Sequence, residues 1–306
     1  QIAILSHSGF SSYDVGVTWW SLDHHLGIRH SQLNSSFTAY GDLRRYNTII
    51  LPSGNPDMND YAKKMLIDWV KQGGTLISNN SSTRSIISSD DIGSVKNLNT
   101  TFDETESYNI DLMREIYSLD EIVDITDANI NKINIDITYP WESSDTSYDT
   151  KQLEMRDKWQ SLLMPSGSIV AARTDSDHWL TFGSENIVPV LYGNNPILMT
   201  DGNSEAVLRI GELIPNEDIQ TNRTINWSQI PAGYDMNVRM SGLVWPEASQ
   251  RIANSAYLTR EKIGKGQIIM FAGEPNFRAA ARGTNRLFLN AVIYGPGLGT
   301  DMLVTP

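Results

Sequence analysis

The hydrophobic pattern of the first 84 residues predicts alternating strands and helices. Short, continuous apolar runs occupy residues 2–6, 47–51 and 75–78, which is typical of parallel strands buried on both faces. Residues 13–25 lie between the first two runs and predict a helix. The segment therefore has a βαβαβ pattern. The helix residues that we expect to face the sheet are Val17, Trp20 and Leu22.

The strongest helical pattern follows the second strand. Asp57 or Asn59 is the expected N-cap, and Gly73 and Gly74 are expected to end the helix. The apolar positions recur at spacings of three and four residues, which predicts one buried face. They are Met58, Tyr61, Ala62, Met65, Leu66, Trp69 and Val70.

The periodicity weakens from about residue 86 to residue 160, where the chain is rich in Asn, Ser, Thr and Asp. A helical signal appears only around residues 111–122. We expect this stretch to form an inserted subdomain packed on the core. Regular structure is predicted to resume at 168–173, 178–183 and 188–192, with a late strand at 267–272 and a final helix around Leu287 to Val292.

These patterns predict a single α/β domain over residues 1–306. Its core is expected at 1–85 and 166–306, with an insertion at about 86–160. The expected fold is a flavodoxin-like, mostly parallel sheet with helices on both faces.

Composition excludes several classes of function. The net charge of -12 and the pI of about 4.8 disfavour nucleic acid and anionic membranes as partners. The absence of cysteine excludes disulfides, thiolate metal sites and cysteine nucleophiles. No apolar run reaches the roughly 18 to 20 residues of a membrane span. The first residues resemble a strand and not a signal sequence, so we expect the chain to be part of a longer protein.

Motifs for nucleophilic, phosphate or metal chemistry are absent from the sequence. There is no G-x-S-x-G, G-x-x-x-x-G-K or G-x-G-x-x-G. The five histidines, at positions 7, 24, 25, 30 and 178, have no zinc-site spacing, so we expect no zinc and no other cofactor. Asp177 and His178 could form an acid/base pair, although a histidine at a strand edge is the simpler interpretation.

The loops after the predicted parallel strands are expected to meet at one edge of the sheet, where open α/β sheets bind ligands. Glu274 and Arg278 follow the late strand, and such charges need a partner or a ligand. They could also pair with each other, or with Arg282. The candidate crevice residues are Ser8, Tyr13, Ser53, Gly54, Asn80, Ser81, Glu274, Asn276 and Arg278.

Several segments together resemble the class I glutamine amidotransferase-like domain that follows the catalytic domain of some bacterial zinc carboxypeptidases. The resemblance covers roughly residues 1–84 and 166–295. The segments that carry it are Ser12 to Gly16, Tyr46 to Gly54, Gly73 to Ile77, Pro275 to Arg278 and Gly283 to Ala291. It implies a flavodoxin-like fold, a secreted or periplasmic location, and the peptidase domain of the same polypeptide as partner.

Active members of the amidotransferase class carry a cysteine at the strand-to-helix elbow and a histidine and glutamate after a late strand. The elbow here holds Asn79, Asn80, Ser81 and Ser82, and only Glu274 matches the late pair. The resemblance therefore implies a pseudoenzyme, an accessory or binding domain that acts on no substrate itself and takes a small-molecule or peptide ligand.

Two alternatives stay open from the residues. One is a serine-dependent or carboxylate-dependent hydrolase at the same crevice, using Ser81 or Ser82 with Glu274 and His178. The other is a carbohydrate-binding or peptide-binding module, which the eight tryptophans would suit.

Overall fold

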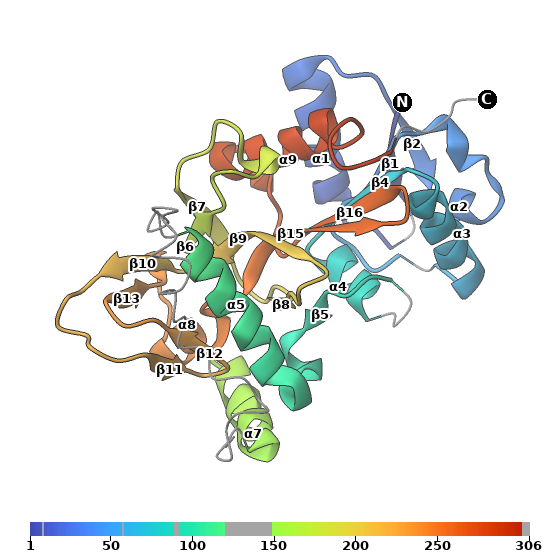
Figure 1. Cartoon of the computed structure of the whole chain (residues 1–306). Helices are drawn as coiled ribbons and strands as arrows, with labels where there is room; N and C mark the ends of the chain where they lie inside the picture. Colours follow the sequence, from blue (N-terminus) through green and yellow to red (C-terminus); the bar gives the residue numbers. More distant parts are fainter. Residues whose placement is uncertain (8, 57, 89–91, 120–148, 302–306) are drawn as a thin grey trace, which may run out of the picture.

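The structure, a computed structural model, describes residues 1–7, 9–56, 58–88, 92–119 and 149–301. One large mixed sheet runs through these residues, and helices cover both of its faces (Figure 1). Half of the sheet is parallel and half is antiparallel. The two halves meet at the hairpin formed by the last two strands of the described chain.

The parallel half has the strand order of flavodoxin-like folds. Its strands are β1 (Ile2–Ser6), β2 (His30–Asn34), β3 (Thr48–Leu51), β4 (Thr75–Asn79) and β16 (Gly266–Phe271). They pair in the order β2-β1-β3-β4-β16, and every pair is parallel. The four predicted apolar strands are confirmed, because β1, β3, β4 and β16 are almost wholly buried.

The sequence pattern predicted two strands of the antiparallel half, Ser168–Thr174 and Ile187–Tyr192, and missed the others. Its main strands are β15 (Ala256–Ile263), β9 (Glu205–Ile210), β6 (Ser168–Thr174), β14 (Arg239–Ser241) and β7 (Ile187–Tyr192). The shorter strands are β8 (Leu198–Met199) and β5 (Lys96–Asn97). Two small antiparallel sheets have two strands each: β10 (Glu212–Pro215) pairs with β13 (Tyr234–Asn237), and β11 (Arg223–Ile225) pairs with β12 (Ser228–Ile230). Residues 178–183 contain no strand, since Trp179–Thr181 form a 3₁₀ turn, η4.

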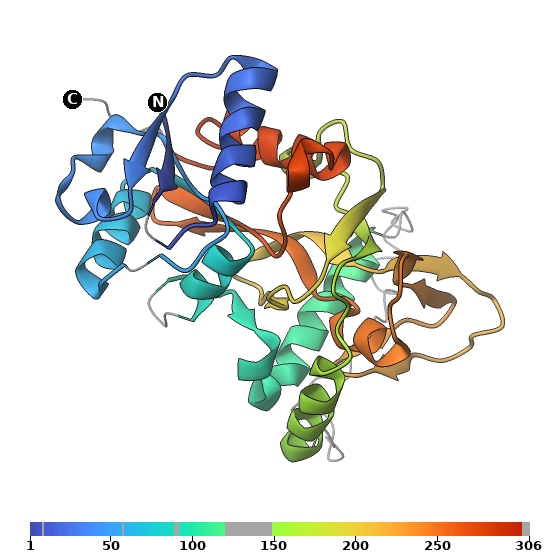
Figure 2. The same cartoon turned by 180° about the vertical axis from the view of Figure 1, so that it is seen from behind.

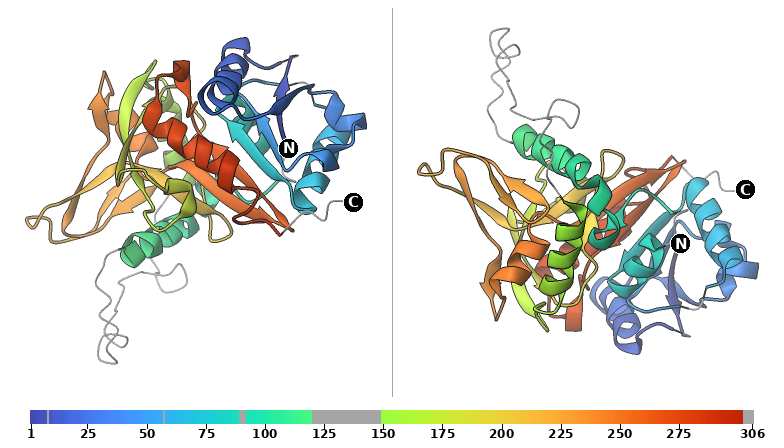
Figure 3. Two further views of the ribbon diagram at one scale, coloured as in Figure 1. Left: turned by 90° about the horizontal axis from the view of Figure 1, so that it is seen from above. Right: turned by 90° about the horizontal axis from the view of Figure 1, so that it is seen from below.

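The helices divide between the two faces of the sheet. α1 (Ser12–Leu26) and α9 (Arg282–Tyr294) lie on one face, and α4 (Ser81–Ile87) and α5 (Thr105–Leu119) on the other (Figures 1 and 3). Figure 2 shows α1 beside the segment that leads into α9. The remaining helical segments are α2 (Phe37–Tyr40), α3 (Asp60–Lys71), α7 (Thr150–Ser161), α8 (Pro246–Ile252), η1 (Leu43–Arg45), η2 (Leu98–Thr100), η3 (Phe102–Glu104) and η5 (Phe277–Ala279).

The stretch predicted as an insertion contributes mainly helices. Its described residues form α5, α7, short 3₁₀ turns and the two-residue strand β5, which pairs with β8 away from the parallel strands. Glu115 of α5 binds the guanidinium of Arg209 on β9 at 2.7 Å. This ion pair fixes α5 to the antiparallel half of the sheet.

Helix α3 begins and packs largely as its sequence predicts. Asn59 is the N-cap, and its side chain accepts a hydrogen bond from Ala62 N at 2.8 Å. Leu66, Trp69 and Val70 are buried. Tyr61 was predicted to lie on the buried face of this helix, which is wrong, because its side chain is 59% exposed.

Replacing this cap tests the assignment. We expect Asn59→Ala to lower the free energy of unfolding by about 1 kcal/mol, because one amide at the start of α3 loses its acceptor. Asn59→Asp keeps an acceptor and should stay close to the wild type. Urea denaturation measures both, and equal stabilities of the two variants would contradict the capping role.

Candidate functional site

The loops after β1 and β3 are joined by backbone hydrogen bonds. Ser11 N donates to Ser53 O at 2.9 Å, and Asn55 N donates to Gly9 O at 2.8 Å. Gly54 permits this approach, since a Cβ there would lie 2.5 Å from Gly9 O. The usual ligand crevice of a flavodoxin-like sheet, between β1 and β3, is therefore closed by the protein's own backbone.

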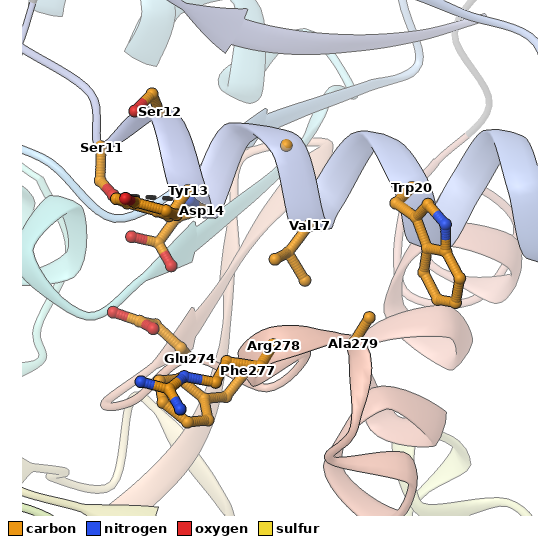
Figure 4. A pocket seen from close by; sticks show the side chains of 11 residues that line it. Ser11, Ser12, Tyr13, Asp14, Val17, Trp20, Glu274, Phe277, Arg278 and Ala279 are labelled. Atoms are coloured by element: carbon orange, nitrogen blue, oxygen red, sulfur yellow. Dashed lines mark hydrogen bonds between the residues drawn. The ribbon is translucent and has the colours of Figure 1, made fainter.

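An open groove lies beside this closed crevice, between the first half of α1 and η5. Its volume is about 880 Å³. In Figure 4 the carboxyl groups of Asp14 and Glu274 face each other at one end, and Trp20 lies at the other. The lining residues are Ser11, Ser12, Tyr13, Asp14, Gly16, Val17, Trp20, Glu274, Phe277, Arg278 and Ala279.

The two carboxyl groups form a hydrogen-bonded acid pair. Partial burial, together with the hydrogen bond and negative charge of Asp14, raises the pKa of Glu274 to about 7. Asn80 Nδ2 donates to Glu274 Oε1 at 3.2 Å, and the Ser53 hydroxyl also binds this carboxylate. No lysine, arginine or histidine within the described ranges lies within 4 Å of either carboxyl. The pair is thus satisfied by neutral donors and by a shared proton.

Asn80 occupies the strained turn between β4 and α4. Its φ of 45° and ψ of -109° lie in a region that non-glycine residues rarely adopt, at a cost of about 1–3 kcal/mol. Its backbone N–H donates to Phe271 O at 3.0 Å, which fixes the turn beside the end of β16. The side-chain amide of Asn80 is therefore held at this turn, beside Glu274.

The neighbouring serines have no activating base among the described residues. Ser81 is exposed. Ser82 is buried, and its hydroxyl donates to Pro52 O at 2.5 Å. His178 binds elsewhere, because its Nδ1 accepts from Leu180 N at 3.1 Å and its Nε2 lies 3.3 Å from Glu205. Among the described residues, neither Ser81 nor Ser82 therefore has the base that the serine hydrolase alternative requires.

The structure brings together five of the predicted crevice residues. Tyr13, Glu274 and Arg278 line the groove, while Ser53 and Asn80 contact Glu274. Three others do not line the groove. Gly54 belongs to the contact between the loops after β1 and β3, Ser81 is exposed to solvent, and Asn276 is buried with its Nδ2 3.5 Å from Thr18 Oγ1. The ninth, Ser8, lies outside the described residues.

Arg278 does not pair with Glu274. Its guanidinium lies over the Phe277 ring, 5.1 Å from the ring centre, and no ion pair joins Arg278 or Arg282 to a carboxylate in the part of the chain that the structure describes. The predicted internal pairing of Glu274 with Arg278 or Arg282 is therefore wrong in this conformation.

The sequence pattern misassigned one face of α1. Val17 and Trp20 were expected to contact the sheet, but both line the groove, and of the three predicted residues only Leu22 is buried. Asp14 was overlooked as a partner of Glu274. Asp14, Val17 and Trp20 recur at a spacing of three residues, so they share a face, and that spacing was the signal available.

Neither a metal site nor a membrane span emerges from the described residues. No group of three or more His, Asp or Glu side chains there is arranged to hold a metal ion. No helix among them is long and apolar enough to cross a bilayer.

The strand order, the elbow and the helices on both faces define a mixed α/β domain with the flavodoxin-like arrangement of class I glutamine amidotransferase-like proteins. The predicted fold class is confirmed. No protein family model matches the chain, and no curated protein matches it.

Solved structures share the general arrangement at low identity. A ThuA-like protein from Bacteroides uniformis is 11% identical, with 95% of this chain and 89% of that chain covered and a TM-score of 0.46. A ThuA-like protein from Parabacteroides merdae is 9% identical, with 99% and 95% covered and a TM-score of 0.44. A β-galactosidase from Bacillus circulans is 12% identical, with 96% of this chain but 30% of that chain covered and a TM-score of 0.44.

These findings correct the family resemblance seen in the sequence. The link to zinc carboxypeptidases is wrong, because no family model supports it and the similar structures described above, two of them ThuA-like proteins, have no such link. The expected secretion and peptidase partner had rested on this resemblance, and they stay untested.

Proposed function

We propose that this chain is a ligand-binding domain without catalysis of its own, and that its ligand site is the groove between α1 and η5. The observation that carries the proposal is Asn80 at the strained elbow, with its side-chain amide bonded to Glu274 beside an open groove. An amide is no nucleophile. The elbow geometry here serves to hold the acid pair in place.

Gly16 offers a direct test of the groove as a binding site. It lies on α1 and lines the groove, and a Cβ built there meets no atom within 4 Å. Gly16→Leu should therefore fold and fill the groove, whereas Gly16→Ala should leave it open. Both variants should gain up to about 1 kcal/mol of helix stability.

Ligand-observed NMR with a fragment set of mixed charge measures the difference. We expect fragments that bind the wild type and Gly16→Ala to lose at least ten-fold in affinity for Gly16→Leu. Equal binding to all three proteins would place the fragments elsewhere and contradict the proposal.

Glutaminase and esterase assays test the proposed lack of catalytic activity. We expect no rate that Ser81→Ala or Ser82→Ala removes, because neither hydroxyl has a base within reach. A rate abolished by either substitution would overturn this half of the proposal.

A carboxylate-dependent hydrolase is the second candidate, and the acid pair favours it. Two carboxyl groups that share a proton can activate water, as in aspartic proteases. A hydrolytic rate against peptide or ester substrates that both Asp14→Asn and Glu274→Gln abolish would support this candidate over simple binding.

A further inference from the structure

Within the part of the chain that the structure describes, no cationic side chain forms an ion pair with the acid pair of the groove. Glu274 contacts Asp14, Asn80 and Ser53, and only a proton can hold its carboxyl against that of Asp14. The nearest candidate cation, Arg278, lines the same groove but stacks on Phe277. A cation entering at this end would find two carboxylates already positioned.

The rest of the groove is predominantly apolar. In Figure 4, Val17 and Ala279 lie between the acid pair and Trp20. A ligand with hydrocarbon along this wall gains from burial, whereas a polyhydroxylated ligand would find few hydrogen-bonding groups there. The positive charge of Arg278, which lies at the Glu274 end of the groove in Figure 4, disfavours a second cationic group.

We propose that the groove binds a primary amine with an apolar body. Its ammonium group would lie at Asp14 and Glu274, and its apolar part would lie against Val17, Ala279 and Trp20. The inference rests on the proposed function and names the ligand class of the same site. It requires that the ammonium ion take the place of the proton that the two carboxyl groups share.

This exchange makes binding depend on pH. The groups that face Glu274 are Asp14 from α1, Asn80 before α4, Ser53 after β3, Tyr257 from β15 and Arg278 from η5. Burial raises the pKa of Tyr257 above its usual range, whereas the pKa of Glu274 is about 7, so the acid pair titrates near neutral pH. With a pKa of about 7 for Glu274, amine affinity should rise about ten-fold from pH 6 to pH 8.

Isothermal titration calorimetry with three probes of matched shape tests the proposal. Phenethylamine is cationic, 2-phenylethanol is neutral and 3-phenylpropionate is anionic. We expect phenethylamine to bind at least ten-fold more tightly than either of the others. At pH 6.5, titrations in phosphate and in Tris should differ in apparent enthalpy by an amount that corresponds to the release of most of one proton.

Variants assign the effect to the acid pair. Glu274→Gln and Asp14→Asn should each weaken phenethylamine binding at least ten-fold and abolish the buffer dependence. Asp23→Asn, an exposed carboxylate on the same helix, should leave both unchanged. Circular dichroism confirms that each variant is folded, and the Gly16→Leu variant should bind no probe even if one acid variant is unstable.

The outcomes separate this inference from the proposed function. If 2-phenylethanol binds as tightly as phenethylamine, or if the amine binds without proton release, the ligand class is wrong while the groove remains a binding site. If 3-phenylpropionate binds most tightly, Arg278 and not the acid pair governs recognition, and the inference is again wrong. If no probe and no fragment distinguishes Gly16→Leu from the wild type, the proposed function itself fails.

Discussion

Glu115→Ala is expected to lower the free energy of unfolding by about 3–5 kcal/mol, because it leaves a buried cation without its anion. Arg209 is only 4% exposed. Its Nε and Nη2 donate to the Glu115 carboxylate at 2.7 to 2.9 Å. Its remaining donors bind Asn254 O and Thr200 Oγ1, and these neutral groups cannot replace the lost charge.

The guanidinium of Arg173 lies near Arg209 and increases the expected loss of stability in Glu115→Ala. Burial and repulsion by Arg209 lower the pKa of Arg173 to about 10, and the negative charge of Glu115 opposes this shift. Arg173 Nη2 binds Asn254 Oδ1 at 2.9 Å. The negative charge of Glu115 therefore stabilises both Arg173 and Arg209. Without it, the two guanidinium groups repel each other, with only Asn254 bound to both.

Urea denaturation at pH 7 measures the loss. The matched control is Glu104→Gln, which removes a carboxylate in an exposed ion pair with Lys96 and should cost less than about 1 kcal/mol. A Glu115→Ala variant as stable as the Glu104→Gln variant would show that the buried pair adds nothing to the fold.

Glu274→Gln is expected to stabilise the protein at high pH and to leave it unchanged at low pH. The folded pKa of about 7 lies above the ordinary value of 4.5, so the folded state binds more protons between these values. The contribution of this group to stability is present below pH 4.5 and is lost as the pH rises through 7. Glutamine mimics the protonated acid, and after allowance for partial exposure we expect a gain of about 1–2 kcal/mol at pH 8.

Thermal or urea denaturation from pH 4 to pH 9 measures this gain. Glu205→Gln is the control of opposite sign, because the His178 hydrogen bond and then Arg260 lower the pKa of Glu205. That variant should lose stability at neutral pH and recover towards the wild type as the pH falls. If the difference in stability between Glu274→Gln and the wild type does not change with pH, the raised pKa of Glu274 is wrong.

Four of the five parallel strands were predictable because they are continuous apolar runs between clear turn residues. The fifth, β2, was not predicted, because it is mostly polar and only partly buried. Strands such as β9 and β15 were not, because they bury Arg209, Thr259 and Glu261 among apolar residues. Buried polar side chains break the two-residue and continuous patterns that mark strands. Their partners, such as Glu115 for Arg209, are distant in the sequence and give no local signal.

The candidate site was predicted only where it follows strand ends. Glu274 and Arg278 follow β16, and parallel order places them at the ligand edge of the sheet. The groove itself depends on η5, where Arg278 and Ala279 adopt left-handed φ values of 51° and 55°. Since neither residue is glycine, no local signal predicts this turn, and the α1 face opposite it was assigned to the core.

The place of β16 between β4 and β15 has a consequence for biosynthesis. The hydrogen-bonded side chains of Thr75 and Gln267 belong to adjacent strands but lie 192 residues apart in the chain. A ribosome adds roughly 5–20 residues per second, so the edge of β4 waits roughly 10–40 s for its neighbour. During that interval the nascent parallel half presents an apolar, unpaired strand edge, and chaperones that shield such edges should strongly influence the yield of folded protein.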